Sequence, residues 1–243
     1  MKNIKRKIIP LSLCVSMILG SQLFAENTNT LLEEITISQE QSNSASNNVT
    51  EGTGSYTTKS MKTATKLDLS IRETPQSIVV ITKQQMEDFN YTSLEDIINN
   101  TAGLNPSKFG TESVYMTARG FEIDYYQIDG IPTSRYTPVI DLSIYDRIEV
   151  VKGANGLMTG AGNPAASINM VRKHANSKEF TGKATISAGS WDTYRGDFDI
   201  STPLNSDGSV RGRIVSSYGE KDSYKNYYSK DTTVLYGVVD SDI

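Results

Sequence analysis

The chain has 243 residues, of which 37% are hydrophobic, and its formal net charge at pH 7 is −4. This acidic balance argues against a nucleic-acid partner, because such a partner needs a basic surface. The single cysteine cannot form an internal disulfide, and one cysteine with one histidine supplies too few ligands for a zinc site.

Residues 1–25 have the pattern of a secretory signal peptide. A basic start at residues 2–7 is followed by a short apolar run at residues 8–19, and Ala25 offers a small residue before a cleavage point. The apolar run is too short for a good membrane-spanning helix. We therefore expect an exported protein that loses Cys14 with its signal peptide.

Residues 26–65 form the second predicted segment. Residues 38–62 are rich in Ser, Asn, Thr and Gly, which is typical of a flexible linker. Before this linker stands a short β-prone island that consists of Glu33, Glu34, Ile35, Thr36, Ile37 and Ser38. The island is either a chance group of apolar residues or a docking strand that adds to the sheet edge of another protein.

Residues 66–174 carry mixed strand and helix signals, which predicts a small α+β domain. Runs of β-formers predict strands at Ser77–Ile81, Ser113–Ala118, Tyr125–Ile128 and Arg147–Lys152. Capping boxes at Thr82–Gln85 and Thr92–Glu95 predict the starts of two short helices. Asp129-Gly130 is a strong signal for a tight turn.

Residues 175–243 change to alternating polar and apolar sequence. This alternation predicts four strands, at Lys183–Ala188, Tyr194–Ile200, Val210–Ile214 and Thr233–Asp240. We expect a tight turn at Asn205–Gly208 and a longer polar loop at Glu220–Asp231. Charged residues on one face and aromatic residues on the other fit a membrane β-barrel with a wet lumen, but also a soluble β-meander with one solvated face.

The glycine-rich stretch Gly160–Ala165 matches the letter of a dinucleotide-binding pattern. Such a site needs a helix directly after the glycines. Here Pro164 and the sequence SINMVRK follow, and β-branched residues in alternation predict a strand. We therefore interpret the glycines as backbone devices in a compact domain and expect no nucleotide site.

Four motifs in this order carry a family resemblance: RETPQSIVVITKQQMED, SLEDIINNTAGL, ARGFEIDYYQIDGIP and IEVVKGANGLMTGAGNPAASINMVRK. Together they resemble the plug domain of TonB-dependent siderophore receptors, and their sequences are most similar to those of the ferric-pyoverdine and coprogen type. The predicted signal peptide, island and alternating strands fall where that family has its export signal, TonB box and first barrel strands.

The resemblance implies an α+β plug domain (66–174) followed by antiparallel transmembrane β-barrel strands (175–243), about four of about 22. Four strands cannot close a barrel, so we expect a fragment of a longer gene product. The implied function is import of a ferric siderophore across the outer membrane of a Gram-negative bacterium, without enzymatic chemistry. The implied partners are TonB, the siderophore and outer-membrane lipid, and the only iron is that of the ligand, with no other cofactor.

The resemblance also implies site residues. The TonB box is Glu33 to Ser38. We expect three loops of the plug to face outward and to contain six candidate siderophore contacts, namely Lys108, Phe109, Tyr125, Tyr126, Arg135 and Tyr136. Arg119 and Lys152 match the two plug arginines that pair with barrel glutamates in related receptors, although lysine lacks the bidentate fork of arginine. Two alternatives stay open: a receptor for haem, cobalamin or a glycan, and an exported β-protein without a transport role.

Overall fold

The computed structural model describes residues 49–67, 69–109, 113–133, 140–153, 156, 160, 164–223 and 227–242. The predicted signal peptide, the Glu33–Ser38 island and the first part of the predicted linker lie outside the described residues. In the described part, no helix is long and apolar enough to cross a membrane.

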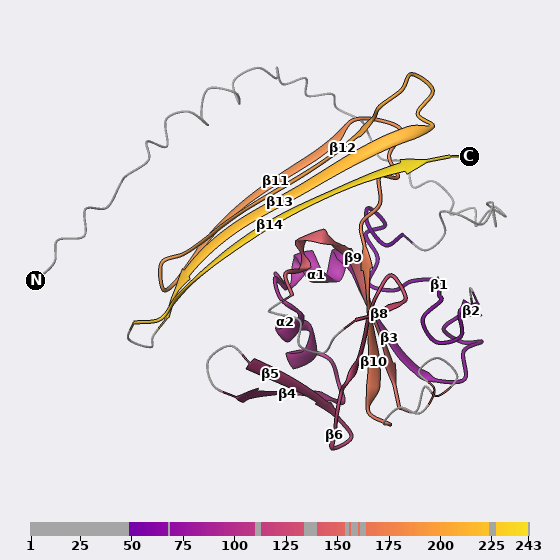
Figure 1. The fold of residues 1–243 in the computed structure, drawn as a ribbon, viewed down its shortest axis with the longest axis vertical. Coiled ribbons are helices and arrows are strands. Elements are labelled where there is room, and N and C mark those ends of the chain that lie inside the picture. The colour runs from indigo at the N-terminus through magenta and orange to yellow at the C-terminus, as the bar shows by residue number, and fades with distance from the viewer. Residues whose placement is uncertain are drawn as a thin grey trace, which may run out of the picture. The chain divides into compact units, whose positions relative to one another are not determined.

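A five-stranded sheet forms the centre of the plug domain, in the order β3-β9-β10-β7-β8 (Figure 1). Its strands are β3 (Ser77–Thr82), β7 (Tyr125–Ile128), β8 (Ile131–Thr133), β9 (Tyr145–Lys152) and β10 (Ala166–Arg172). The pair β10–β7 is parallel, and the other neighbours are antiparallel. The predicted strands of this region are confirmed, and SINMVRK is a strand rather than a helix, as expected.

Two short helices follow the expected capping chemistry. Helix α1 (Lys83–Asp88) begins at Thr82, whose side chain accepts a hydrogen bond from the Gln85 amide. Helix α2 (Leu94–Asn99) has a capping box, but it is formed by Ser93 and Asp96. The predicted box at Thr92–Glu95 is therefore wrong by one residue. The carboxylate that accepts hydrogen bonds from the amides of Thr92 and Ser93 belongs to Asp96 and not to Glu95.

A second sheet completes the plug core. It contains β4 (Leu104–Phe109), β5 (Ser113–Ala118) and β6 (Phe121–Glu122), in that order. One large hydrophobic cluster joins the two helices to the sheets, with Ile97, Ile98, Ile148 and Ile168 fully buried. Helix α2 presents Leu94, Ile97 and Ile98 to this core, as the helical spacing predicts.

Residues 49–65, which we call the N-terminal strap, are docked on the plug. Strand β1 (Ser60–Met61) pairs with β2 (Leu69–Ser70), and Met61 and Ala64 join Val80 and Val151 in a second small core. The prediction of a flexible linker up to residue 65 is therefore wrong for the strap. Its polar composition includes two buried threonines: the Thr50 hydroxyl donates to the backbone carbonyl of Asp146, and the Thr63 hydroxyl donates to the buried carboxylate of Glu149.

After the plug, the chain forms an antiparallel meander of four strands, which we call the wall strands. They are β11 (Thr181–Gly189), β12 (Thr193–Pro203), β13 (Val210–Asp222) and β14 (Ser229–Ser241). The four predicted strands are confirmed, but the predicted loop at Glu220–Asp231 is too long at both ends, because β13 continues to Asp222 and β14 begins at Ser229. Glu220 pairs directly with Asp231, since polar residues are compatible with a ladder whose bonds come from the backbone.

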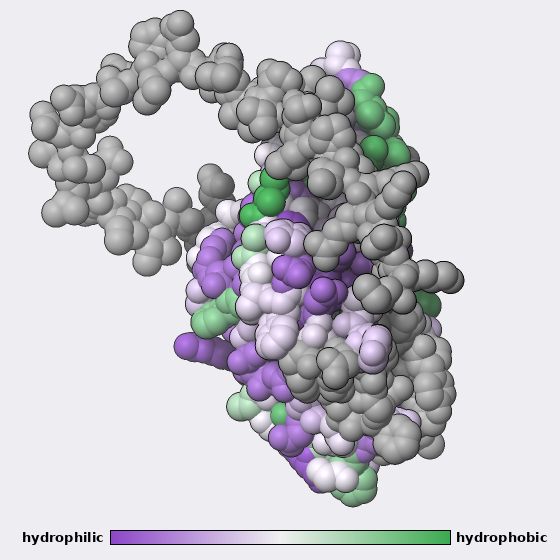
Figure 2. All heavy atoms as spheres, turned by 90° about the vertical axis from the view of Figure 1, so that its left-hand side faces the viewer, coloured by the Kyte–Doolittle hydropathy of each residue, from purple (hydrophilic) through white to green (hydrophobic). Residues whose placement is uncertain are grey.

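The wall strands have two chemically different faces. Phe198, Ile200 and Ile214 are exposed on one face, at 52%, 45% and 60% of their surface. Their sequence neighbours Asp199 and Arg213 point the other way and pair with each other. The space-filling view shows a largely hydrophilic surface on which hydrophobic residues gather in patches (Figure 2). A strand with one apolar and one ion-paired face suits a barrel wall between lipid and a filled interior.

Candidate functional site

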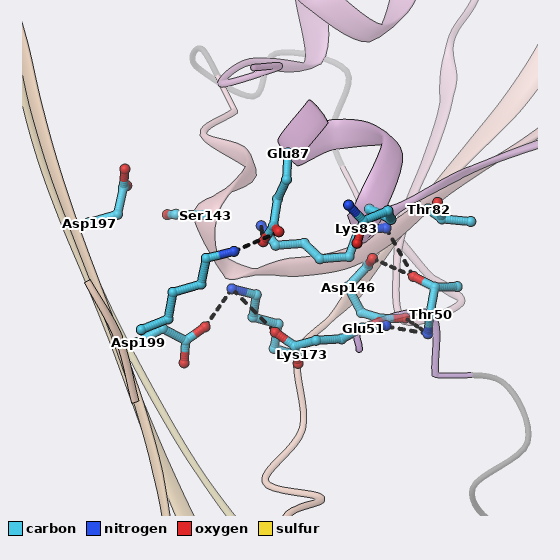
Figure 3. A network of polar contacts seen from close by, with 12 residues as sticks. Thr50, Glu51, Thr82, Lys83, Glu87, Ser143, Asp146, Lys173, Asp197 and Asp199 are labelled. Carbon is cyan, nitrogen blue, oxygen red and sulfur yellow. Dashed lines mark hydrogen bonds and ion pairs between the residues drawn. The ribbon is translucent and has the colours of Figure 1, made fainter. Parts of the chain in front are cut away.

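The candidate site joins the N-terminal strap, the plug and the wall strands. At its centre lies the short 3-10 helix η3 (Leu142–Ile144) and the start of β9, where Asp141 and Asp146 present their carboxylates. Figure 3 shows Thr50 and Glu51 beside Asp146, and Lys173 between Glu51 and Asp199.

Asp146 anchors the strap through its backbone. The Thr50 amide donates to both carboxylate oxygens of Asp146, at 3.0 and 3.1 Å, and the Glu51 amide donates to Oδ1 at 2.9 Å. The Thr50 hydroxyl donates to the Asp146 carbonyl at 2.9 Å and accepts from the Lys83 amide at 3.0 Å. Thr50 is only 2% exposed, so the strap is fixed at this point by a saturated set of hydrogen bonds.

Glu51 reaches the wall strands. Its carboxylate accepts two hydrogen bonds from the Arg213 guanidinium, each at 2.6 Å, and Lys173 lies 4.0 Å away. Arg213 also donates to Asp199, to which Lys173 donates at 2.6 Å. Burial alone would raise the pKa of Glu51, but the hydrogen bonds and charge of Arg213, with the charge of Lys173, outweigh burial and lower it.

Two further ion pairs connect plug and wall. Arg195 of β12 donates to both carboxylate oxygens of Asp141, at 2.7 and 3.0 Å. Lys183 of β11 donates to Glu87 of α1 at 2.6 Å. Burial opposes ionisation of Asp141, yet its bonds from Arg195 and Ser143 lower its pKa below the usual range. Each wall strand β11, β12 and β13 therefore carries one basic residue paired with an acid on the plug side.

A cavity of about 660 Å³ opens between these groups. Its lining is strongly charged and includes Lys83, Glu87, Arg195, Asp197, Asp199 and Arg213. Lys83 is the least well paired of them, since its ammonium lies 3.7 Å from Glu87. Burial, with the charge of Lys173 in support, lowers the pKa of Lys83 to about 8. Among the described residues, no cluster of three potential metal ligands occurs.

Beneath the strap lies a buried polar network. Asp146, Arg147 and Glu149 of β9 are 4%, 7% and 1% exposed. Arg147 bridges the two carboxylates, with Nη1 at 2.9 Å from Asp146 and Nε at 2.6 Å from Glu149. Thr63 of the strap donates to Glu149 and accepts from Asn169 Nδ2 at 2.7 Å. The strap therefore contributes partners to both buried carboxylates.

The predicted siderophore contacts are only partly described. Arg135 and Tyr136 lie outside the described residues, as do the side chains of Lys108 and Phe109, so these four stay predictions. Tyr125 is half-buried, and its hydroxyl accepts from Gln127 at 3.3 Å.

Tyr126 is the exception among these contacts. It is only 6% exposed and belongs to the plug core, where burial raises the pKa of its hydroxyl. The expectation that its side chain faces outward is therefore wrong. Its β7 neighbour Tyr125 points to the other face of the strand, as alternation requires.

The two cations predicted to lock plug to wall lie close together. Arg119 has a left-handed backbone (φ +55°), and its guanidinium covers Gly153, where an added Cβ would meet Nη1 at 2.8 Å. Lys152, the neighbour of Gly153, donates to the Ala102 carbonyl at 2.7 Å. Their pairing with barrel acids stays a prediction.

The predicted TonB box lies outside the described residues, and the interface centred on Glu51 and Arg213 was not predicted from the sequence. One signal was available: the charged residues Arg195, Asp197 and Asp199 alternate on one face of a strand, which marks a face that needs counter-charges. The plug-side partners carry no comparable local signal.

Comparison with known proteins gives a consistent family assignment. Residues 70–167 match the family described as TonB-dependent Receptor Plug Domain. The chain is 45% identical over 202 residues to the ferripyoverdine receptor of Pseudomonas aeruginosa, a match that covers 80% of this chain and 25% of the relative. A ferric-pyoverdine 358 receptor of Pseudomonas putida is also 45% identical, over 80% of this chain and 24% of its own length.

Solved structures agree. The crystal structure of the Pseudomonas aeruginosa outer-membrane ferripyoverdine receptor bound to ferripyoverdine superimposes with a TM-score of 0.77 at 44% identity, over 81% of this chain and 27% of that one. The alcaligin outer-membrane receptor of Bordetella pertussis gives a TM-score of 0.73 at 42% identity, over 80% of this chain and 34% of that one. The chain spans about a quarter of the length of the curated relatives described above.

Proposed function

Because this chain belongs to the TonB-dependent siderophore receptor family, whose N-terminal region it matches, we propose that the full-length receptor imports a ferric siderophore of the pyoverdine class. It resides in the outer membrane of a Gram-negative bacterium, binds the ligand at the cell surface and releases it into the periplasm. The reaction is transport, with no covalent step, and the iron is cargo rather than a resident cofactor.

One observation carries the proposal: a plug domain continues directly into antiparallel strands whose polar face is ion-paired to it. Glu51, Asp141 and Glu87 meet Arg213, Arg195 and Lys183 of three successive strands. Such a set of ion pairs keeps a plug seated in a barrel through a few discrete contacts, of which the exposed pair Lys183–Glu87 is individually weak. A plug that must move is better held by such pairs than by a continuous apolar interface.

Energy for the movement comes from TonB, which pairs with the strand Glu33–Ser38 and pulls. Backbone pairing with an added strand supplies most of the affinity in this mode of recognition, so little sequence specificity is needed. The ligand binds on the opposite side, at plug residues that include Tyr125, Arg135 and Tyr136. Arginine and tyrosine offer donors and flat apolar faces to an oxygen-rich iron chelate.

The ligand class is tested by surface binding to cells that express the full-length receptor and lack other siderophore receptors. Radiolabelled ferripyoverdines of several peptide types are offered at low temperature, with unlabelled ferrioxamine, haem and cobalamin as competitors. We expect saturable binding of at least one ferripyoverdine that haem and cobalamin do not displace. Saturable binding of haem or cobalamin in place of every ferripyoverdine contradicts the siderophore assignment.

A further inference from the structure

The N-terminal strap makes two attachments at one place. Thr50 and Glu51 give their amides to Asp146 of the plug sheet, and the Glu51 side chain takes two bonds from Arg213 of the wall. Adjacent residues thus hold sheet and wall together. A force that displaces these two residues acts on both attachments at once.

The wall side of this attachment is part of a shared ion cluster. Arg213 divides its guanidinium between Glu51 and Asp199, and Asp199 also takes the Lys173 ammonium. Lys173 stands directly after β10 and is 4% exposed, and its carbonyl accepts from the Tyr236 hydroxyl at 2.8 Å. If Glu51 leaves, two cations remain with one carboxylate. The junction between the last plug strand and the wall then loses half of its anionic charge.

The plug side depends on the strap as well. Asp146 and Glu149 are buried, and among the described residues both pair with the same cation, Arg147. The remaining negative charge is balanced by strap groups, namely the amides of Thr50 and Glu51 and the hydroxyl of Thr63. A buried carboxylate that loses such donors pays the full desolvation penalty. Departure of the strap therefore exposes an uncompensated charge inside the sheet.

The order of these contacts along the chain sets the order of their release. Any pull from the N-terminal side reaches Thr50 and Glu51 before Met61 and Ala64, which form the second small core with Val80 and Val151. The polar contacts of Thr50 and Glu51 are loaded first, and the apolar contacts of the second small core are loaded later. The strap is built to detach in steps rather than all at once.

We propose that Thr50–Glu51 is the release point of the plug: a pull on the preceding segment separates Glu51 from Arg213 and Asp146, and this loosens the plug from the wall before the sheet itself yields. The inference rests on the proposed function, since TonB supplies the pull. It adds the residues through which that pull is converted into separation of plug and wall.

The first test fixes the release point covalently in the full-length receptor. Glu51→Cys with Arg213→Cys is treated in cells with a short bis-maleimide cross-linker. We expect unchanged surface binding of ferric siderophore and uptake reduced to the level of cells without TonB. Uptake by the same variant before treatment is the reference rate. The matched control, Glu220→Cys with Asp231→Cys, joins two directly opposed residues of β13 and β14 and leaves uptake intact after treatment.

Uptake at the untreated rate in the fully cross-linked variant overturns the inference while the proposed function stands. If the unmodified receptor shows no TonB-dependent uptake, the proposed function fails and the inference fails with it.

A second test needs neither transport nor cross-linking. In the purified full-length receptor, Glu51→Gln removes the charge that holds the strap to Arg213, so tryptic cleavage at Lys59, the tryptic site of the strap nearest to Glu51 and ahead of Met61, should accelerate roughly tenfold. Glu73→Gln is the control, because that exposed carboxylate bonds to Ser70 and not to the wall. Cleavage of Glu51→Gln at the unmodified rate contradicts a release point at this residue, even if the double-cysteine variant fails to reach the membrane.

Discussion

Glu51 and Arg213 are 162 positions apart in the chain, yet their side chains form a two-pronged ion pair with both N···O distances at 2.6 Å. Nη1 and Nη2 each donate to a different carboxylate oxygen, so this geometry gives direction as well as attraction. Glu51 belongs to the strap and Arg213 to β13. The pair therefore joins the strap, which follows the predicted TonB box in the chain, to a wall strand.

Replacing Arg213 with lysine should loosen the strap. Lysine keeps the charge but cannot bond to Glu51 and Asp199 through a planar fork. We expect hydrogen exchange at the Thr50 and Glu51 amides to accelerate roughly tenfold in the full-length receptor. Arg211→Lys is the matched control, since Arg211 lies on the same face but bonds to Asp242 and two backbone carbonyls. Equal exchange in both variants speaks against the pair as the strap's anchor.

Thr63→Val should destabilise the plug. The substitution keeps shape but removes the hydroxyl that donates to Glu149 and accepts from Asn169. We expect a loss of about 1–3 kcal/mol in the free energy of unfolding, because a buried carboxylate loses a donor. Calorimetry of the full-length receptor measures it. Thr57→Val, at an exposed strap position, should cost less than about 0.5 kcal/mol, and equal costs at the two sites refute the buried network.

Lys83 should make stability depend on pH in the alkaline range. Its pKa is lowered from 10.5 to about 8, chiefly by burial, so between these values the unfolded chain binds more protons than the folded one. Stability therefore rises as pH rises from about 8 to 10.5. Lys83→Met should be more stable than the unmodified receptor at pH 7, by an amount on the order of 3 kcal/mol. That advantage should vanish near pH 10.5.

Thermal unfolding at pH 7 and at pH 10.5 checks this prediction. Glu87 keeps its partner Lys183 at 2.6 Å in the variant, so no carboxylate is orphaned. Lys59→Met, at an exposed position, should show a pH profile parallel to that of the unmodified receptor. If the pH profile of Lys83→Met is also parallel to that of the unmodified receptor, the Lys83 ammonium lies in water rather than in the cavity, and the prediction is wrong.

Tyr136→Ala should weaken ligand binding without lowering the amount of receptor in the outer membrane. The prediction follows from the position of Tyr136 in an outward loop of the plug family and from the flat apolar face that tyrosine offers to a chelate. Surface binding of radiolabelled ferripyoverdine measures it. Tyr126→Phe is the contrasting change, because Tyr126 packs in the core and its loss of a hydroxyl should leave affinity unchanged. Unchanged affinity in Tyr136→Ala removes Tyr136 from the ligand site.

Local patterns in the sequence predict much of the fold. Ser77–Thr82 and Tyr145–Lys152 are strands because β-branched residues follow each other between turn signals, and no distant contact is needed to recognise them. The shift of the capping box from Thr92 to Ser93 is a competition between neighbours for one carboxylate, Asp96, which the sequence leaves open.

Local sequence patterns could not predict the docked strap or the ion pairs between the plug and the wall strands. Thr50 and Thr63 lie in a polar stretch that is typical of a linker, and they are buried because their partners, Asp146 and Glu149, are buried carboxylates far along the chain. Pairs such as Arg195–Asp141 are fixed by how the plug meets the wall. Neither segment has a periodic pattern from which the contact between plug and wall could be predicted.

The central claim, TonB-energised import of a ferric siderophore, is tested most directly by measuring surface binding and accumulation of ferripyoverdine-bound radiolabelled iron separately. The full-length receptor and its Ile37→Pro variant are compared in cells with and without TonB. Proline deletes a backbone donor from the strand that TonB must pair with. We predict normal surface binding in every case, and accumulation only by the unmodified receptor in cells that contain TonB. Accumulation by Ile37→Pro at the unmodified rate, or by the unmodified receptor in cells without TonB, would contradict the account.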